Sequence, residues 1–249
     1  MSIIATSHFQ LAVYQQGDLQ AKKLALVLPG KLDTKDYPHM RSQVEYLAKK
    51  GYLALSFDPP GTWESPGDIS LYSMKNYLTA INDLITHFGN RPTFVVGHSR
   101  GGSMAMLAGT RNPFVTHFAS IMSFYSFEPQ IHGEYPDKEW EKDGYRISKR
   151  DLPGKLPEFK EFRVPYSFLE DQIRYDALED LKKSPKPKLF ILGKKDILVK
   201  PKVVQTAFDA AHSPKELREL DSDHDYRHSL KLIGQVNKFL GEFLDLYAF

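Results

Sequence analysis

Residues 95–102 are VVGHSRGG in one-letter code, and no other stretch says more about the architecture of this chain. The centre of this stretch, residues 97–101, has the pattern Gly-x-Ser-x-Gly, between the apolar run 93–96 and a run of small residues, 102–109. A sharp turn from a buried strand into a helix strains the serine backbone and lifts the hydroxyl out of the sheet edge. The flanking glycines suit such a turn because they avoid steric clashes. We therefore predict that Ser99 is a nucleophile.

Two kinds of segment alternate along the chain. Residues 70–88 and 233–247 carry apolar side chains every three or four positions, which is typical of amphipathic helices packed on a sheet. Short apolar runs that end in turn residues are typical of buried parallel strands. These runs cover residues 24–28, 52–57, 93–96, 120–125 and 189–192. Since strands that alternate with helices form βαβ units, we expect an α/β fold with a mostly parallel central sheet flanked by helices.

Residues 127–176 interrupt this alternation. They show no clean period, and a loop this long without structure would be unusual unless it were functional. We predict a small cap over the active site, with residues 1–126 and 177–249 as the α/β core. The alternative is a surface excursion with a small core of its own. A Ser-x-x-Glu pattern at residues 167–170 predicts a helix start. The segment is rich in aromatic side chains: Tyr135, Trp140, Tyr145, Phe159, Phe162, Tyr166 and Phe168.

A serine hydroxyl is a weak nucleophile at neutral pH and needs a general base, usually a histidine. On a nucleophile turn of this kind the partners follow in the order serine, acid, histidine. His224 lies after the strand-like run 216–220 and before the last helical stretch, so we predict that it is the base. His228 is the competitor four residues on, and we expect it to lie in the helix and to point elsewhere.

The base in turn needs an acid that orients its ring. Asp196 follows the apolar run 189–192 and a turn, so it should lie at the carboxyl end of a strand, where open α/β sheets bind their ligands. We predict that Asp196 is this acid. Asp171 and Asp176 are competitors within or near the insertion, and a solvated aspartate in a lysine-rich turn is the plainer interpretation of Asp196.

A tetrahedral oxyanion needs two backbone N–H donors. We expect one from Arg100, the residue after the nucleophile. The other should come from the loop after residues 24–28, with Lys31 as the choice and Leu32 as the alternative; the plainer interpretation of Pro29-Gly30 is a simple turn. We expect side chains around these groups to contact the substrate: Leu32, His98, Phe124, Tyr125 and Trp140.

Composition narrows the possible partners and compartment. The formal net charge is +2, from 33 basic and 31 acidic side chains, which gives no reason to expect nucleic acid or an anionic membrane as a partner. The absence of cysteine excludes disulfides, thiolate metal sites and a cysteine nucleophile. The first 17 residues do not resemble a signal peptide. We expect a cytoplasmic protein, a monomer or homodimer, that needs no metal and no cofactor.

Five landmarks together resemble the α/β-hydrolase superfamily over nearly the whole chain: Leu28-Pro29-Gly30, the turn at residues 57–61, the serine motif at 97–102, the turn at 193–196 and Asp223-His224-Asp225. More narrowly, the chain is similar to small serine esterases related to serine aminopeptidases, monoacylglycerol lipases and cinnamoyl or feruloyl esterases. Relatives usually have His-Gly where this chain has Pro29-Gly30.

The resemblance implies a serine hydrolase. The leading hypothesis is a carboxylesterase that forms an acyl-enzyme on Ser99 and cleaves short-to-medium acyl or small aromatic esters. A peptidase, a thioesterase or a carbon–carbon bond hydrolase would use the same three residues. A non-catalytic binding protein on the same fold is the remaining alternative, because fold alone does not establish activity.

Overall fold

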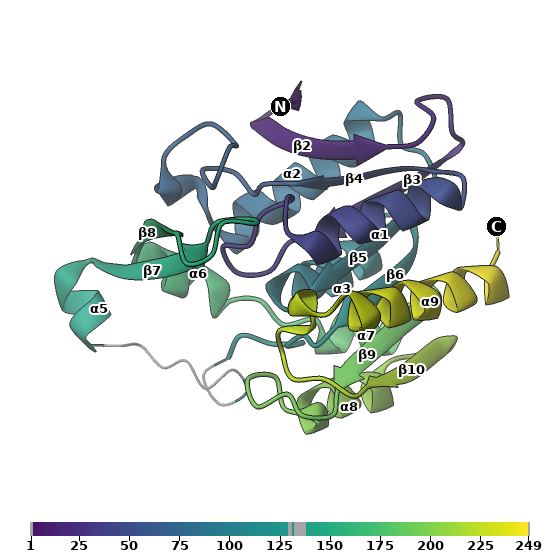
Figure 1. Ribbon diagram of the computed structural model, residues 1–249. Coiled ribbons are helices and arrows are strands. Elements are labelled where there is room, and N and C mark those ends of the chain that lie inside the picture. Colours follow the sequence, from purple (N-terminus) through teal and green to yellow (C-terminus); the bar gives the residue numbers. More distant parts are fainter. Residues whose placement is uncertain (1, 129–130, 132–137, 249) are drawn as a thin grey trace.

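An eight-stranded sheet forms the centre of the computed structural model, which describes residues 2–128, 131 and 138–248 (Figure 1). The strand order is β1-β2-β4-β3-β5-β6-β9-β10, and all pairs from β4 to β10 are parallel. β1 and β2 extend one edge as antiparallel strands. The strands are β1 (Ser2–Ala5), β2 (Gln10–Gln16), β3 (Lys23–Leu28), β4 (Tyr52–Phe57), β5 (Thr93–His98), β6 (Val115–Ile121), β9 (Lys188–Gly193) and β10 (Lys215–Leu220). The expected mostly parallel α/β sheet is confirmed.

Helices cover both faces of this sheet (Figure 1). α1 (Pro38–Lys49) and α9 (Leu230–Leu246) pack on one face. The other face carries α2 (Met74–His87), α3 (Arg100–Arg111), α7 (Leu178–Lys183) and α8 (Pro201–Ala210). β3, β4, β5 and β9 are therefore buried from both sides, which explains why they are continuous apolar runs rather than alternating ones. The helical periods at 70–88 and 233–247 are confirmed, with a short 3₁₀ turn, η1 (Ile69–Leu71), ahead of α2.

One predicted strand has different bounds. The apolar run 120–125 was expected to be a strand, but β6 ends at Ile121. Met122 has a left-handed φ of 48°, so the chain turns away from the sheet there. Phe124 and Tyr125 consequently lie beyond the strand, at the end of the sheet where the candidate site is found.

The inserted segment has structure of its own. It contains α5 (Lys138–Asp143), the antiparallel hairpin β7 (Tyr145–Asp151) and β8 (Phe159–Pro165), and α6 (Ser167–Gln172). Ser126 and Asp176 form an isolated antiparallel bridge, so the two ends of the segment meet. α6 exists, but the predicted Ser-x-x-Glu cap is wrong, because Tyr166 occupies the N-cap position and Ser167 is already helical.

Three aromatic side chains of the insertion are buried in a small core, whereas Phe159 is exposed. Trp140, Phe162 and Phe168 are buried together with Leu32 and Tyr72 of the α/β core. Tyr135, which was counted among these aromatics, lies outside the described residues. The segment is therefore joined to the loop after β3 by apolar contacts, and we retain 127–176 as a proposed cap.

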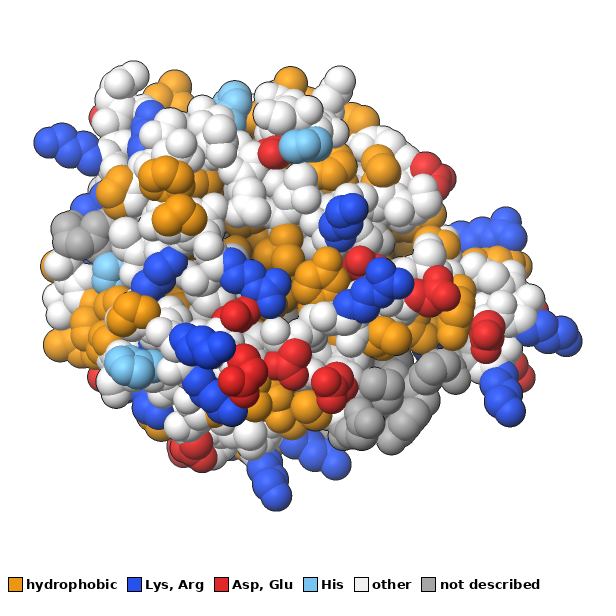
Figure 2. All heavy atoms as spheres, turned by 180° about the vertical axis from the view of Figure 1, so that it is seen from behind, with side chains coloured by type: hydrophobic (Ala, Val, Ile, Leu, Met, Phe, Trp, Pro, Cys, Tyr) orange, Lys and Arg blue, Asp and Glu red, His pale blue; other side chains and the backbone are white. Residues whose placement is uncertain are grey.

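The surface carries charges of both signs. Seen from behind, on the face that α2, α3, α7 and α8 cover, Lys and Arg side chains are interspersed with Asp and Glu (Figure 2). None of the helices in the described parts of the chain has both the length and the hydropathy that crossing a bilayer requires.

Candidate active site

Ser99 occupies the sharp turn between β5 and α3. Its φ of 53° and ψ of −123° are unusual for a residue with a side chain, and its N–H donates to the carbonyl of Ile121 at 2.9 Å. Strained backbone of this kind persists only where the surroundings hold it, and it gathers at functional sites. The strand-to-helix context expected around the Gly-x-Ser-x-Gly motif is therefore present.

The glycines of the motif are required by the close approach of backbone segments. A Cβ added to Gly97 would lie 2.2 Å from the carbonyl carbon of Gly101, and one added to Gly101 would lie 2.0 Å from the carbonyl oxygen of Leu28. A Cβ on Gly102 would lie 1.9 Å from the hydroxyl of Ser123. None of the three positions has room for a larger residue, so the turn requires glycine at 97, 101 and 102.

Three predicted residues meet at this turn. Ser99 Oγ lies 3.0 Å from His224 Nε2, and His224 Nδ1 lies 2.8 Å from Asp196 Oδ2. A carboxylate only accepts hydrogen bonds, so Nδ1 of the ring carries the proton and Nε2 presents its lone pair to the serine hydroxyl. This arrangement can remove the proton from Ser99 when the hydroxyl attacks an electrophile.

Backbone donors hold the acid in place. Asp196 Oδ1 accepts hydrogen bonds from the N–H groups of Leu198 at 2.9 Å and Val199 at 2.8 Å, which leaves Oδ2 for His224. The side chain of Asp196 is fully buried. The plainer interpretation, a solvated aspartate in a lysine-rich turn, is wrong.

The competing residues have other roles. Asp171 accepts the N–H of Met74 at 2.7 Å, and Asp176 accepts the N–H of Leu178 at 2.6 Å, so each supports the start of a helix. His228 was expected inside the last helix, but it lies in the short turn η2 (Tyr226–His228) and is exposed. Within the described part of the chain, His224 and Ser99 form their side-chain hydrogen bonds with each other and with Asp196, and none of the three competitors takes part in them.

His98 lies behind the ring of His224. Its Nε2 is 3.0 Å from the carbonyl oxygen of His224, so Nε2 carries the proton of the neutral ring. Burial, together with the neighbouring imidazoles of His224 and His39, holds the pKa of His98 well below its ordinary value. The ring therefore stays neutral and supports the backbone of the base.

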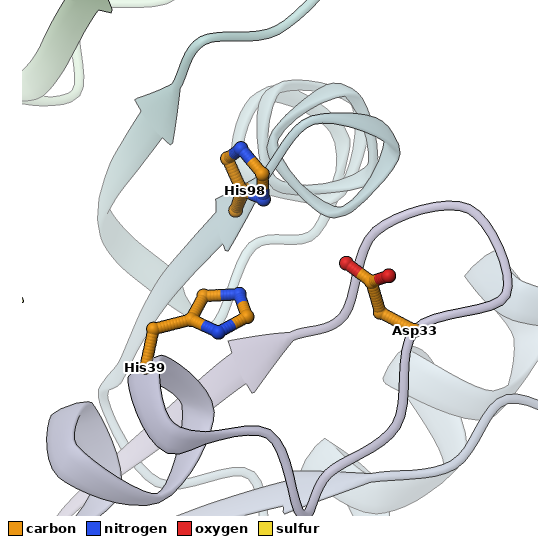
Figure 3. A group of neighbouring side chains, drawn as sticks. All are labelled: Asp33, His39 and His98. Carbon is orange, nitrogen blue, oxygen red and sulfur yellow. The ribbon is translucent and has the colours of Figure 1, made fainter. Parts of the chain in front are cut away.

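Asp33, His39 and His98 point into a common space from three elements: the loop after β3, the start of α1 and the end of β5 (Figure 3). Their donor atoms all lie within 4.8 Å of one another, and all three residues are buried. Burial, with a smaller contribution from the charge of Arg227, lowers the pKa of His39 to about 3. Two neutral imidazoles and a carboxylate are donors that Zn²⁺ or Fe²⁺ accepts, so these residues could hold a metal.

A cavity of about 410 Å³ opens at Ser99. This volume lies within the range of small-molecule sites, roughly 300–1,000 Å³. Six of the lining residues were predicted from the sequence: Lys31, His98, Ser99, Arg100, Phe124 and His224. No such place was predicted for the other five, which come from loops and from the inserted hairpin. The lining residues are Lys31, Asp33, His98, Ser99, Arg100, Phe124, Phe127, Arg150, Leu198, His224 and Asp225.

Three predicted substrate contacts do not line the cavity. Leu32 and Trp140 are buried in the core of the insertion, where Trp140 Nε1 donates to the carbonyl of Val164 at 3.1 Å. Tyr125 packs against the core on the side of α2 and α3. In each case apolar packing turns the side chain away from Ser99, so these predictions are corrected.

Geometry favours Lys31 over Leu32 as the second backbone donor. The N–H of Leu32 donates to the hydroxyl of Tyr72 at 3.0 Å. That N–H is therefore already used within the protein. Lys31 lines the cavity beside Arg100, whose N–H starts α3, and the pair remains the predicted oxyanion hole.

Solved structures with the same arrangement of elements include several hydrolases. Alpha/beta hydrolase domain-containing protein 10 from mouse is 20% identical over 99% of each chain, with a TM-score of 0.78. Est1E from Butyrivibrio proteoclasticus, solved with ferulic acid bound, is 19% identical over 98% of this chain and 100% of its own, with a TM-score of 0.76. The enol-lactonase from Burkholderia xenovorans is 17% identical over 98% of this chain and 100% of its own, with a TM-score of 0.74.

Identities this low show a common fold and nothing finer. No curated protein matches this chain. The sequence profile of the alpha/beta hydrolase fold matches residues 26–155, which is more than half of the chain and includes Ser99 and the loop after β3. The chain therefore belongs to the alpha/beta hydrolase fold family.

Proposed function

We propose that this protein is a serine hydrolase that cleaves carboxylic esters through an acyl-enzyme on Ser99. One observation carries the proposal: the hydrogen-bonded series Ser99, His224 and Asp196 stands at the edge of the 410 Å³ cavity. The same three residue types in this geometry support acyl transfer on unrelated folds.

In the first half of the proposed reaction, Ser99 Oγ attacks the ester carbonyl carbon while His224 Nε2 takes the hydroxyl proton. Asp196 stabilises the imidazolium that forms. The carbonyl oxygen becomes negatively charged, and the N–H groups of Arg100 and Lys31 are the proposed donors that stabilise it. His224 then gives the proton to the leaving alcohol as the C–O bond breaks.

In the second half, a water molecule attacks the acyl-enzyme. His224 takes one proton from this water, and the hydroxide adds to the carbonyl carbon. Collapse of the second tetrahedral intermediate breaks the bond to Ser99 Oγ, which takes the proton back from His224. This half releases a carboxylic acid and regenerates the enzyme. Over both halves, one ester and one water molecule give one carboxylic acid and one alcohol.

The cavity supports small substrates. Phe124, Phe127 and Leu198 supply apolar surface, while the volume is near the lower end of the range for small-molecule sites. We therefore propose short-to-medium acyl or small aromatic esters. Est1E with ferulic acid bound is a structural neighbour that carries a small aromatic acid. We also propose that the protein is cytoplasmic and that its partner is a small-molecule ester rather than a nucleic acid or a membrane.

A fluorophosphonate probe combined with a substrate panel tests the proposal. The probe should label wild type on Ser99, and mass spectrometry of the labelled peptide identifies the residue. The panel contains acyl esters, thioesters and aminoacyl amides of matched acyl groups. Ester turnover well above thioester and amide turnover supports the proposal. If Ser99 is labelled but thioesters or amides are cleaved faster than esters, the substrate class is thioester or amide and the ester proposal is wrong. If no labelling occurs, a non-catalytic protein is favoured.

A further inference from the structure

The hairpin of the insertion contacts the loop that carries the proposed oxyanion donor. Arg150, on β7, donates from both Nε and Nη2 to the carbonyl oxygen of Lys31, the first at 2.9 Å. These residues are 119 positions apart in sequence. A two-pronged contact from a planar guanidinium fixes direction as well as distance.

The same peptide unit is held at its other end. The carbonyl of Lys31 and the N–H of Leu32 belong to one planar peptide group. Arg150 holds the carbonyl, and the hydroxyl of the buried Tyr72 accepts the N–H at 3.0 Å. The orientation of the plane that follows Lys31 is thus set by two side chains from outside the loop.

The loop needs such support because it is strained. Leu32 has a φ of 56°, in the left-handed region that residues with a branched side chain avoid. Strained backbone persists only where its surroundings determine it. Without the contacts to Arg150 and Tyr72, we expect the loop to relax and Lys31 to turn its N–H away from Ser99.

Arg150 also faces a buried charge. Its Nη2 lies 3.5 Å from Asp33 Oδ1, two residues after Lys31. Burial raises the pKa of Asp33, and the charges of Arg150 and Arg227 act in the opposite direction. The guanidinium of Arg150 is therefore positioned by the carbonyl of Lys31 and the carboxylate of Asp33, and both of these residues line the cavity.

We propose that Arg150 is a positioning residue that sets the oxyanion hole from the inserted hairpin by holding the peptide group between Lys31 and Leu32. The inference rests on the proposed function, because it assigns Arg150 to the tetrahedral oxygen of that reaction. The hairpin then forms part of the catalytic apparatus in addition to being a cover.

The test compares Arg150→Ala, Arg150→Lys and Tyr72→Phe with wild type. Lys149→Ala is the matched control, because Lys149 is the neighbouring cation of the same strand and pairs with Glu161 on the surface. With an uncharged ester, Arg150→Ala should lower kcat by about 10–100-fold with little change in KM, since a small misplacement of catalytic groups costs up to about 100-fold. Arg150→Lys and Tyr72→Phe should lose less, and Lys149→Ala nothing.

A tetrahedral analogue separates this role from a structural one. The inhibition constant of a trifluoromethyl ketone should rise by the same factor as kcat/KM falls, while a ground-state amide should bind unchanged. Thermal unfolding followed by circular dichroism checks that each variant is folded. If Arg150→Ala does not fold, the same comparison in Arg150→Lys and Tyr72→Phe decides.

Two results would overturn the inference. The first is unchanged kcat and analogue binding in folded Arg150 and Tyr72 variants. The second is a KM increase confined to esters with an anionic group, which would make Arg150 a substrate contact. The rate of fluorophosphonate labelling provides a readout that needs no ester turnover. If wild type is labelled but cleaves no ester, the proposed function fails. The labelling rates of the Arg150 variants, compared with that of wild type, still test the positioning role of Arg150.

Discussion

The imidazole of His98 lies directly behind that of His224, with ring centroids 4.7 Å apart and His98 Nε2 3.0 Å from the carbonyl oxygen of His224. A second positive charge at this place would oppose protonation of the base during the reaction. Burial lowers the pKa of His98 well below its ordinary value and so prevents that charge.

This relationship predicts a simple pH dependence. Only the neutral imidazole of His224 accepts the proton of Ser99, so activity should be present at high pH and fall as the solution becomes more acidic. His98 stays neutral over the same range, so log kcat/KM should fall with a slope of one. A slope of two between pH 5 and 8 in a steady-state pH profile would show that His98 titrates with the base.

Ser99→Ala should abolish ester turnover and leave the fold intact. Residues of a catalytic triad act as a unit, so kcat should fall by about 10⁴–10⁶-fold. Ser7→Ala, at an exposed position that does not line the cavity, is the matched control and should keep full activity. Most of the activity surviving in Ser99→Ala, measured on p-nitrophenyl acetate, would remove Ser99 as the nucleophile.

His224→Ala should cost about as much as the loss of Ser99, and Asp196→Asn somewhat less, because the amide keeps part of the orientation of the ring. The control is His228→Ala, an exposed histidine in η2 that should remain active. Single-turnover kinetics with folded variants provide the measurement. A dead but folded His228→Ala enzyme beside an active His224→Ala enzyme would reverse the assignment of the base.

The size of the cavity predicts acyl-chain selectivity. Each buried methylene contributes about 0.8 kcal/mol until the space is filled, and further carbons then contribute nothing or clash. In a cavity of about 410 Å³, kcat/KM should rise over the first few acyl carbons and then fall. The measurement is a series of p-nitrophenyl esters from acetate to palmitate. A continuous rise to palmitate, with activation at a lipid–water interface, would identify the inserted segment as a lipase lid instead.

Asp151, the neighbour of Arg150 on β7, connects the hairpin to the segment that follows His224. Both of its carboxylate oxygens accept hydrogen bonds from Arg227 at 2.9 Å, three residues after His224. Burial acts to raise the pKa of Asp151, but the hydrogen bond and charge of Arg227 outweigh it, and the pKa is lowered. The stabilisation is therefore present above the unfolded pKa and is lost as pH falls through the folded pKa.

Asp151→Asn should consequently reduce the free energy of unfolding near pH 7 by roughly 1.5–3 kcal/mol, the value of hydrogen bonds to charged groups. The difference from wild type should shrink as pH falls below about 4, where the carboxylate of the unfolded chain becomes protonated first, and it should vanish below the lowered pKa of the folded state. Urea unfolding at pH 7 and pH 3 measures both values. An equal difference at the two pH values would show that the charge of Asp151 contributes nothing to stability.

Much of the candidate site could be predicted because its determinants are local. The nucleophile turn needs glycines at 97, 101 and 102, since a Cβ at any of them would collide with backbone or with Ser123. Asp196 and His224 each follow a strand of a parallel sheet, and the carboxyl ends of such strands meet at one edge. A short apolar run followed by turn residues is therefore enough to indicate a strand and the position of the residue that follows it.

Contacts between distant segments could not be predicted in this way. No local pattern distinguishes Arg150 from the other cations of the hairpin, and its place at the carbonyl of Lys31 depends on how β7 docks on a loop 119 positions earlier. The errors at Leu32, Tyr125 and Trp140 have the same origin, because an apolar side chain fits equally well in a core or in a substrate cavity.

The sequence by itself determined the α/β sheet, the turn at Ser99 and the order in which the acid and the base follow, because backbone sterics and apolar periodicity act between near neighbours. The tertiary structure alone decided which side chains line the cavity and which hold the loop of Lys31. Those outcomes depend on packing and hydrogen bonding between elements that only the completed fold brings together.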